Sequence, residues 1–455
     1  MFKFNFNEVL PSYLNLDENV YNWELLSSNY DTKYNVNIDI YSLKSQIWPL
    51  NSGQVWEHNL IIYKPDNILH NTALLYANGG YNNNITGAKL FSPPKIHENL
   101  NFASLAAENN AVLIEIQNLP NQYIFFEDKI PKKEDEIISY SFKKVLENPE
   151  QNAYYAGHLP MAKAIVKAMD AAQEIAKEKY NDDIENFVAV GASKRGWAVW
   201  LAAIADERIS AIIPIVIDIL NTEKNIKHIC DSYKEEIPPA LRNYNEDGMI
   251  DHIGTENMKK LMMIEDPLSY KDNKETYKRL SIPKYIINSS GDDFFVPDSS
   301  NLYFKDLPGE KNYIRYLPNS SHYADSNIVQ ASVSNYFKTF VNNIDLPKIN
   351  WEFDNNSIHI NSSEQPIYAK LWTAHNPVSR DFRYNNYSFS GNSKGNIRYI
   401  ETDISFDHAD LDFNIPLPTQ ENGWQANFIE LGYDIKGIPM IFTTGVNITP
   451  DIYPT

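Results

Sequence analysis

Residues 188–197 read "VAVGASKRGW", and this stretch decides how the chain folds around it. Its small and branched residues predict a buried strand, and the continuation "GWAVWLAAIAD" (196–206) predicts a helix. Ser193 lies at the bend between them, where its hydroxyl would be presented at the carboxyl edge of a sheet and at the positive end of a helix. Gly191 and Gly196 keep such a bend free of side-chain clashes. The stretch therefore predicts a strand–turn–helix with a functional serine at the turn.

Strands and helices alternate on both sides of this turn. Two strand-like runs (72–77 and 111–116) flank a helix-like segment (100–110), and a long amphipathic segment (159–180) precedes the serine. Another apolar strand (209–218) follows it. Strands that alternate with helices are typical of a mostly parallel sheet with helical crossovers. The sequence therefore predicts the α/β class.

The later part of this region continues the same rhythm. A strand at 284–290 and a helix that ends near residue 344 complete a predicted α/β domain of residues 1–345. Residues 119–155 are of mixed character, and residues 219–280 are helical and irregular. We expect these two insertions to form a cap or lid that selects the substrate.

The pattern of predicted secondary structure changes from about residue 348. Short aromatic and β-branched runs, among them "RDFRYNNYSFS" (380–390), are separated by turns, and no helical pattern interrupts them. Such spacing is typical of an antiparallel β-sandwich. We therefore predict an all-β sandwich domain of the immunoglobulin or fibronectin type at residues 346–455, with the boundary near 342–350.

Composition narrows the class of protein. The chain has 455 residues, which favours two domains, and its net charge of −19 argues against nucleic acid or an anionic membrane as a partner. No apolar run reaches the roughly 18 residues of a membrane span, and the N-terminus does not show the pattern of a signal peptide. The one cysteine, Cys230, excludes an intramolecular disulfide and is predicted to be structural.

Three residues along the chain match the requirements of a serine hydrolase. The serine needs a base that takes its proton, an acid that orients the base, and N–H donors for the oxyanion. In α/β-hydrolases the chain order is serine, acid, histidine, with the last two in loops after late strands. Ser193, the acidic turn "GDDFFVP" (291–297) and His322 in "LPNSSHYADS" (317–326) follow this order. We predict His322 as the catalytic base.

Three aspartates are candidates for the acid. Asp293, four residues before Pro297, has the spacing commonly seen in this fold and is the first choice. Asp292 is its neighbour and is the first alternative. Asp218, at the end of the strand at 209–218, is the second alternative, because some hydrolases place the acid one strand earlier.

The oxyanion donors are predicted in two places. "ANGGY" (77–81) follows an early strand, so the amides of Gly80 and Tyr81 are candidates, and the amide of Lys194 follows the nucleophile directly. Asn78 is a substrate-binding or structural residue of the same turn.

Arg195 stands where the second glycine of a G-x-S-x-G turn is expected. We expect it to reach a buried carboxylate such as Asp218; the alternative is that it lines the pocket for an anionic substrate. The sequence has no H-E-x-x-H, paired C-x-x-C or phosphate-binding glycine motif, so neither a catalytic metal nor a cofactor is predicted.

Long segments around these residues resemble a known family. "GASKRGWAVWLAAIADERISAIIPIVIDILN" (191–221), "GDDFFVPDSSNLYFKDLPGEK" (291–311) and "LPNSSH" (317–322) are similar to blocks of the PhoPQ-activated pathogenicity-related proteins, a family that includes the autocrine proliferation repressor proteins. The resemblance covers roughly residues 20–340. It implies an α/β-hydrolase fold, with Ser193 and His322 on the family's conserved serine and histidine. The family often has Glu at the position of Asp293, and its members are usually exported.

Three functions remain open at this point. The first is a serine hydrolase of an ester or related acyl substrate. The second is a peptidase that acts near a peptide terminus, for which Glu134–Asp135–Glu136 is the candidate site for capturing a free amino group. The third is a secreted virulence, signalling or binding protein with a vestigial triad, which contacts a protein partner through its C-terminal domain or its acidic surface.

Overall fold

The computed structural model describes residues 5–82, 100–180, 182–234, 237–354, 356–384, 397–405 and 411–455. Its helices are α1 (Val9–Leu14), α2 (Phe102–Asn109), α3 (Asp135–Glu147), α4 (Pro149–Asn152), α5 (His158–Ile175), α6 (Lys194–Ala205), α7 (Thr222–Tyr233), α8 (Arg242–Glu246), α9 (Glu256–Glu265), α10 (Lys274–Leu280) and α11 (Ser326–Val341). Its strands are β1 (Asn22–Asp31), β2 (Val36–Ile47), β3 (Val55–Pro65), β4 (Thr72–Ala77), β5 (Leu113–Ile116), β6 (Ile124–Phe125), β7 (Pro131–Lys132), β8 (Asn186–Ala192), β9 (Ile209–Ile215), β10 (Lys284–Ser289), β11 (Asn312–Leu317), β12 (Ile349–Asp354), β13 (Ser357–Ser362), β14 (Tyr368–Asn376), β15 (Ile400–Asp403), β16 (Asp412–Pro416), β17 (Trp424–Ile435), β18 (Ile438–Thr443) and β19 (Asn447–Thr449).

The chain forms two compact units, each assembled from several stretches. The first unit consists of Met1–Ile217, Asn243–Lys284 and Pro308–Glu310. The second consists of Asp218–Arg242, Tyr285–Leu307 and Lys311–Thr455. Residues 346–455 thus share a unit with earlier parts of the chain, and the predicted domain boundary at residue 345 stays a prediction.

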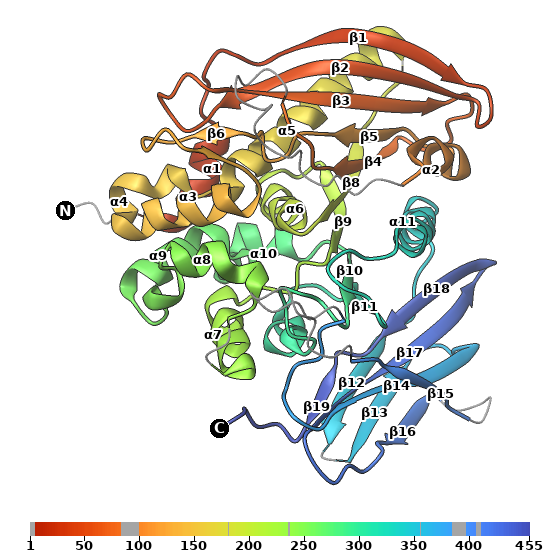
Figure 1. Cartoon of the computed structure of the whole chain (residues 1–455). Coiled ribbons are helices and arrows are strands. Elements are labelled where there is room, and N and C mark those ends of the chain that lie inside the picture. The colour runs from red at the N-terminus through yellow and green to blue at the C-terminus, as the bar shows by residue number, and fades with distance from the viewer. Residues whose placement is uncertain are drawn as a thin grey trace. The chain divides into compact units, whose positions relative to one another are not determined.

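The first unit contains a mixed sheet with strand order β1-β2-β3-β5-β4-β8-β9. The pairs β1–β2, β2–β3 and β3–β5 are antiparallel. The pairs β5–β4, β4–β8 and β8–β9 are parallel. β4 and β8 are almost wholly buried, as expected for central strands of a parallel sheet with helices nearby. This confirms the predicted α/β class, which Figure 1 shows as long strands flanked by helices.

The register of the parallel strands fixes where the serine turn lies. Ala77 at the end of β4 is opposite Gly191 near the end of β8, and Ala192 is opposite Ile215 at the end of β9. Because parallel strands end at the same sheet edge, the loop after β4 and the turn after β8 emerge side by side. The predicted oxyanion loop and Ser193 therefore share one edge of the sheet.

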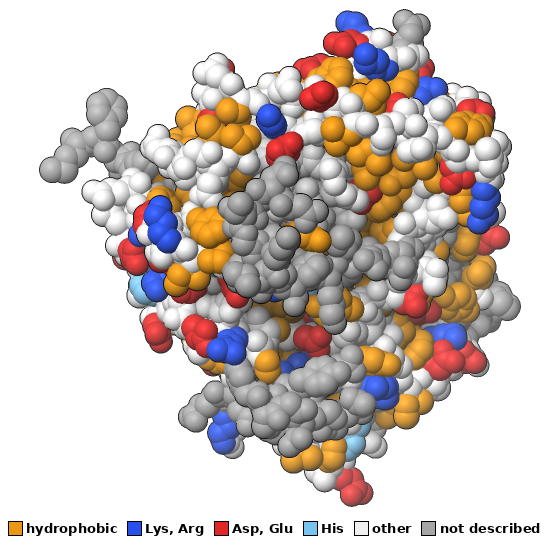
Figure 2. Space-filling view, turned by 45° about the horizontal axis from the view of Figure 1, so that its top comes forward, with side chains coloured by type: hydrophobic (Ala, Val, Ile, Leu, Met, Phe, Trp, Pro, Cys, Tyr) orange, Lys and Arg blue, Asp and Glu red, His pale blue; other side chains and the backbone are white. Residues whose placement is uncertain are grey.

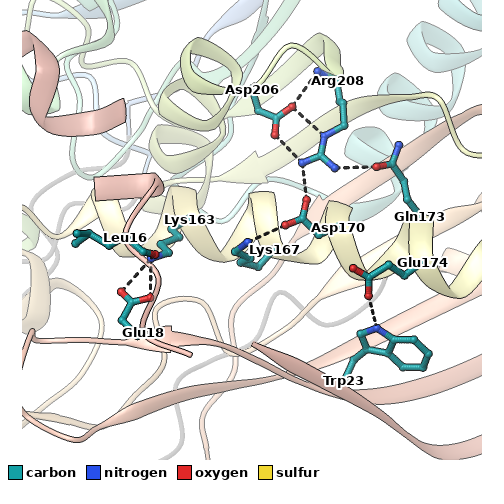
Figure 3. Close-up of polar contacts among 10 residues, drawn as sticks. All are labelled: Leu16, Glu18, Trp23, Lys163, Lys167, Asp170, Gln173, Glu174, Asp206 and Arg208. Atoms are coloured by element: carbon teal, nitrogen blue, oxygen red, sulfur yellow. Dashed lines mark hydrogen bonds and ion pairs between the residues drawn. The ribbon is translucent and has the colours of Figure 1, made fainter. Parts of the chain in front are cut away.

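Polar side chains on α5 connect three segments of the first unit, as Figure 3 shows. Lys163 binds the Leu16 carbonyl and the Glu18 carboxylate in the segment before β1. Glu174 accepts a hydrogen bond of 2.7 Å from the Trp23 indole on β1. Asp170 and Gln173 accept hydrogen bonds of 2.7 Å from Arg208, which also pairs with Asp206 in the turn between α6 and β9. This side of α5 thus connects three segments of the unit, although Glu174 itself is exposed.

The second unit combines the β10–β11 pair with two antiparallel sheets. One sheet has the order β12-β13-β16, and the other has the order β15-β14-β17-β18, with β19 also paired to β17. Burial alternates along β13 and β14, so each strand has one side that packs inward. An all-β C-terminal region is therefore confirmed, whereas its assignment as an immunoglobulin-like sandwich stays a prediction. The predicted strand at 380–390 does not form over 380–384, and its remainder lies outside the described residues.

The predicted cap segments contain separate small elements. Residues 119–155 hold β6, β7, α3 and α4, and residues 219–280 hold α7 to α10, consistent with the helical character expected of the second segment. Their role as a substrate-selecting cap stays a prediction.

The described helices and one face of the surface show how apolar and charged residues are distributed. None of the helices in the described ranges is long and apolar enough to cross a membrane. On the face drawn in Figure 2, acidic and basic side chains are interspersed among hydrophobic and polar ones.

Candidate active site

Ser193 occupies a strained turn between a strand and a helix. It follows β8 directly and is the N-cap residue of α6, with φ 57° and ψ −131°. A side chain with positive φ at this ψ is rare, and such conformations concentrate at functional sites. The Ser193 amide donates to the Ile215 carbonyl (2.8 Å), and its carbonyl accepts from Trp197 in the first helical turn (3.1 Å). This is the backbone geometry expected of the nucleophile in an α/β-hydrolase.

Two glycines allow this turn to close. A Cβ built on Gly191 would lie 2.7 Å from the carbonyl carbon of Arg195, and one on Gly196 would lie 2.7 Å from the Gly191 carbonyl oxygen. Neither contact is compatible with a side chain. Gly196, one position later than in the usual motif, therefore provides the close approach between strand and helix, which leaves residue 195 able to carry a long side chain.

His322 and Asp292 form a buried pair in the second unit. Asp292 follows β10, and His322 lies in the connection between β11 and α11. The Nδ1 atom of His322 is 2.9 and 3.0 Å from the two carboxylate oxygens of Asp292. Both residues are less than 5% exposed, and the Phe294 ring packs against the imidazole in a tilted arrangement, with 4.4 Å between the ring centroids. A carboxylate on Nδ1 fixes the ring and its tautomer, as a catalytic base requires.

Asp293 has a different environment from its neighbour. The contact of His322 is with Asp292, the first alternative of the sequence analysis, and not with Asp293. Asp292 also accepts from the Phe294 amide (2.7 Å). Burial and the adjacent Asp292 carboxylate raise the pKa of Asp293 to about 6. The geometry therefore favours Asp292 over Asp293 as the orienting acid, and the assignment itself stays a prediction.

Asp218, the second alternative, has other partners. Its carboxylate accepts from the hydroxyls of Tyr303 (2.7 Å) and Tyr316 (2.5 Å) inside the second unit. Burial raises the pKa of Asp218 to about 7, although the two tyrosine hydrogen bonds lower it. Nothing in these contacts connects it with His322.

The expected contact between Arg195 and Asp218 is wrong, and Glu134 is the partner instead. Arg195 Nη2 is 2.6 Å from Glu134 Oε1, and Lys194 Nζ is 2.9 Å from Glu134 Oε2. Arg195 does bind a carboxylate, as expected. The carboxylate is that of Glu134, because the start of α3 lies beside the first turn of α6. One Glu134 carboxylate balances only one of these two positive charges, so the alternative in which Arg195 lines the pocket for an anionic substrate stays a prediction.

The predicted oxyanion loop is held by side chains from neighbouring segments. Asn78 Nδ2 donates to Glu115 on β5 (2.7 Å), and Asn78 Oδ1 accepts from the Gly79 amide (2.8 Å). Gly80 has φ 137°, a conformation that strongly favours glycine. Tyr81 follows it, partly buried. The roles of the Gly80, Tyr81 and Lys194 amides in binding an oxyanion stay predictions.

The acidic run proposed to capture an amino terminus already has partners. Glu134 pairs with Lys194 and Arg195, and Asp135 accepts from Tyr244 (3.0 Å) and lies 3.3 Å from Lys194. Glu136 accepts from the Lys133 amide. The peptidase alternative, for which this run is the candidate site, stays a prediction.

Two further features concern nucleophiles and metals. Cys230 on α7 is partly buried, and burial raises the pKa of its thiol, the opposite of an activated cysteine. Among the described residues there is no group of three or more His, Cys, Asp and Glu side chains arranged to hold a metal ion.

Sequence reasoning did not connect Glu134 or Gln122 with the serine turn, nor Glu115 with the loop after β4. Each is distant in sequence from Ser193 and has no motif of its own. Glu115 offered one signal, because a carboxylate in an otherwise apolar strand needs a partner at the sheet edge.

A relative with a curated name matches nearly the whole chain. Autocrine proliferation repressor protein A of Dictyostelium discoideum is 31% identical over 474 residues, which cover 99% of this chain and 92% of the relative.

Solved structures also match, at lower identity. The acetyl xylan esterase of Paenibacillus sp. R4 has a TM-score of 0.48 and 12% identity, covering 73% of this chain and 93% of its own. Acetyl xylan esterase 1 of Thermoanaerobacterium sp. JW/SL YS485 has a TM-score of 0.46 and 13% identity, covering 74% and 93%.

The family model of the PhoPQ-activated pathogenicity-related proteins matches residues 10–383, in agreement with the resemblance found in the sequence. Together with the relative from Dictyostelium discoideum, this match shows that the chain belongs to the PhoPQ-activated pathogenicity-related protein family.

Proposed function

We propose that this protein is a serine hydrolase that cleaves an ester or related acyl substrate, with Ser193 as its nucleophile. The observation that carries the proposal is the backbone of Ser193, held at φ 57° and ψ −131° between β8 and α6. Such a conformation costs on the order of 1–3 kcal/mol, and a structural serine has no need of it. The close fit of Gly191 against Gly196 maintains the turn despite this cost.

The base and acid of the proposal are His322 and Asp292. Asp292 binds His322 at Nδ1, so the atom that accepts the Ser193 proton is Nε2. As the proton leaves, Ser193 Oγ attacks the acyl carbon, and the carbonyl oxygen becomes an oxyanion. His322 then gives the proton to the departing alkoxide, and an acyl-serine remains. Water, deprotonated by the same nitrogen, releases the acid and regenerates Ser193.

The oxyanion in this proposal is bound by backbone amides. Lys194 is the first residue of α6, where N–H groups have no partner inside the helix and the helix end is positive. The Gly80 and Tyr81 amides follow β4, at the sheet edge where β8 also ends. Donors fixed in advance at the position where charge develops are commonly the largest contribution to such catalysis.

The proposal is tested with a set of 4-nitrophenyl esters of increasing acyl length and a matched 4-nitroanilide. We expect the full chain to cleave esters, and Ser193→Ala to lose at least about a thousandfold in kcat/KM. Cys230→Ala is the matched control and retains the wild-type rate. Equal ester rates for wild type and Ser193→Ala would contradict the proposal. Folded wild-type protein without any turnover would favour the non-enzymatic alternative, and preferential anilide cleavage would favour the peptidase.

A further inference from the structure

A largely buried ionic cluster in the first unit, in which the Glu134 side chain is 23% exposed, connects the serine turn with the loop after β4. Its members are Glu134, Lys194, Arg195 and Gln122. Lys194 and Arg195 are 6% and 8% exposed, and Gln122 is fully buried. A carboxylate between two cations in such surroundings is stable only when its hydrogen bonds are also satisfied. The cluster is therefore costly to break and geometrically specific.

Glu134 is bound at both oxygens. Oε1 accepts from Arg195 Nη2 (2.6 Å) and from Gln122 Nε2 (2.8 Å), and Oε2 accepts from Lys194 Nζ (2.9 Å). Burial by itself would raise the pKa of Glu134, but the Arg195 and Lys194 cations outweigh it and hold that pKa below its ordinary value. The lowered pKa favours the ionised form of Glu134 that these contacts require.

The backbone of Glu134 is strained in the same sense as that of Ser193. Glu134 is the N-cap residue of α3, with φ 45° and ψ −124°, and its side chain makes no capping hydrogen bond. A glutamate in an ordinary cap has no reason to adopt this conformation. Here it directs the carboxylate to the first turn of α6.

Gln122 extends the connection to the loop that follows β4. Its amide nitrogen donates to the Gly80 carbonyl (2.5 Å), and its amide oxygen accepts from the Glu134 backbone (2.7 Å). On the other side of the loop, a Cβ built on Gly79 would lie 2.9 Å from Arg195 Nη2. Arg195 Nε also donates to the Leu119 carbonyl (2.5 Å). The Gln122 amide therefore binds the loop at Gly80, the Arg195 guanidinium packs closely against it at Gly79, and both side chains bind Glu134.

We infer that Glu134 is a positioning residue that fixes the Gly80 loop relative to the Lys194 amide, so that the two sets of oxyanion donors stand at a set spacing before substrate binds. This inference rests on the proposed function, because it assigns the spacing a role only if an oxyanion forms there. Glu134 does not touch substrate in this account. It acts through Lys194 and Arg195 on one side and through Gln122 on the other.

A change in the distance between the two sets of oxyanion donors should affect binding of the transition state more than binding of the substrate. Loss of the spacing weakens contacts to the oxyanion, which exists only after attack, and leaves substrate binding largely intact. A displacement of catalytic groups by about 1 Å can cost about a hundredfold in rate. We therefore expect Glu134→Gln to lower kcat about 10- to 100-fold while KM changes less than about threefold.

Gln122→Leu provides a second variant that removes the connection to Gly80 and keeps the Glu134 ion pairs. We expect it to reproduce the effect on kcat, and we expect the double variant to lose no more than the larger single loss, because both break one connection. Glu401→Gln is the matched control, since it breaks an exposed Glu–Lys pair of 2.7 Å with Lys370 outside the predicted cap. It leaves kcat unchanged.

The closing experiment measures, for each variant, the rate of Ser193 phosphonylation by an organofluorophosphonate, the affinity of a boronic acid that mimics the tetrahedral state, and the melting temperature. Phosphonylation and boronate affinity that fall in parallel with kcat/KM, in protein that melts cooperatively, support the inference. Wild-type rates and affinity in folded Glu134→Gln, or independent losses in the double variant, overturn it. A wild-type chain unlabelled at Ser193 refutes the proposed function and the inference with it.

Discussion

At the scale of single residues, the surroundings of two adjacent aspartates give them different properties. Asp292 binds the His322 ring and a backbone amide, whereas burial next to Asp292 raises the pKa of Asp293 to about 6. Sequence spacing could not make this distinction, because both residues lie in one turn, and only the direction of each side chain separates them. The order of serine, acid and histidine was predictable, but the choice of carboxylate was not.

Substitution of the two aspartates tests the assignment. We expect Asp292→Asn to lower kcat by about 1,000- to 10,000-fold, since an amide on Nδ1 no longer favours the tautomer and charge that the base requires. Asp293→Asn should lower kcat less than about tenfold. Steady-state ester kinetics of both variants measure this, and the reverse order of effects would identify Asp293 as the acid.

Asp218 predicts a pH-dependent contribution to stability. Burial raises its pKa to about 7 in the folded chain, above the value of about 4 in an unfolded chain. The protonated form therefore stabilises the fold. This contribution is complete below about pH 4, decreases as the pH rises, and is lost above about pH 7.

Comparison with Asp218→Asn isolates that contribution. The free energy of unfolding of wild type, relative to Asp218→Asn, should decrease by on the order of 2 kcal/mol between pH 5 and pH 8. Denaturant titrations at the two pH values measure it, with the exposed Asp345→Asn as control. A difference that does not depend on pH would contradict the assigned titration.

At the scale of elements, strands that bury side chains were predictable, and strands defined only by pairing were not. β4 was predicted at its exact bounds because its residues are apolar and buried. β1 was missed because most of its side chains are exposed and only its antiparallel pairing with β2 defines it. The contact between the start of α3 and α6 was missed for a related reason, since about 60 residues separate Glu134 from Arg195 and no local pattern brings them together.

The turn between β8 and α6 depends on Gly196. A methyl group there would meet the Gly191 carbonyl oxygen at 2.7 Å and the Ile217 side chain at 2.9 Å. We expect Gly196→Ala to cost about 1–3 kcal/mol and to lower kcat/KM more than tenfold, because relief of the clash moves Ser193.

Gly437→Ala is the matched control for the glycine substitution. Gly437 has φ 84° and open space around it, so alanine there costs roughly 1 kcal/mol in backbone strain without displacing the serine turn. Melting temperatures and kcat/KM of the two variants separate loss of stability from loss of geometry. If both retain wild-type kcat/KM, the turn does not need its close glycine contact.

At the scale of the whole molecule, the pattern of short strand-like runs predicted the all-β C-terminal region but not its contacts with earlier parts of the chain. Within the second unit, Tyr285 on β10 donates to the Ile441 carbonyl (2.7 Å), and the Tyr316 amide on β11 donates to Thr443 (2.9 Å). The Arg380 guanidinium, which is 1% exposed, pairs with the Asp298 carboxylate at 2.6 Å. These contacts join segments that are far apart in the sequence. Residues 346–455 therefore supply buried partners for β10 and β11, the two strands that precede His322.

Removal of residues 346–455 should therefore also destabilise β10 and β11 in the part of the chain that remains. We expect the 1–345 fragment to lack a cooperative thermal transition and to show no ester hydrolysis, because β10 and β11 lose their buried partners. Circular dichroism melts and an ester assay measure this. A soluble fragment that melts cooperatively and has wild-type kcat/KM would show that the domain boundary at residue 345 is complete.

The central claim is that Ser193 is an activated nucleophile. The most direct measurement is peptide mass spectrometry of the full chain after treatment with an organofluorophosphonate at pH 8. We predict one adduct, on the peptide that contains Ser193, which is absent from Ser193→Ala and retained in Cys230→Ala. Folded wild-type protein without an adduct, or an adduct that persists in Ser193→Ala, would contradict it.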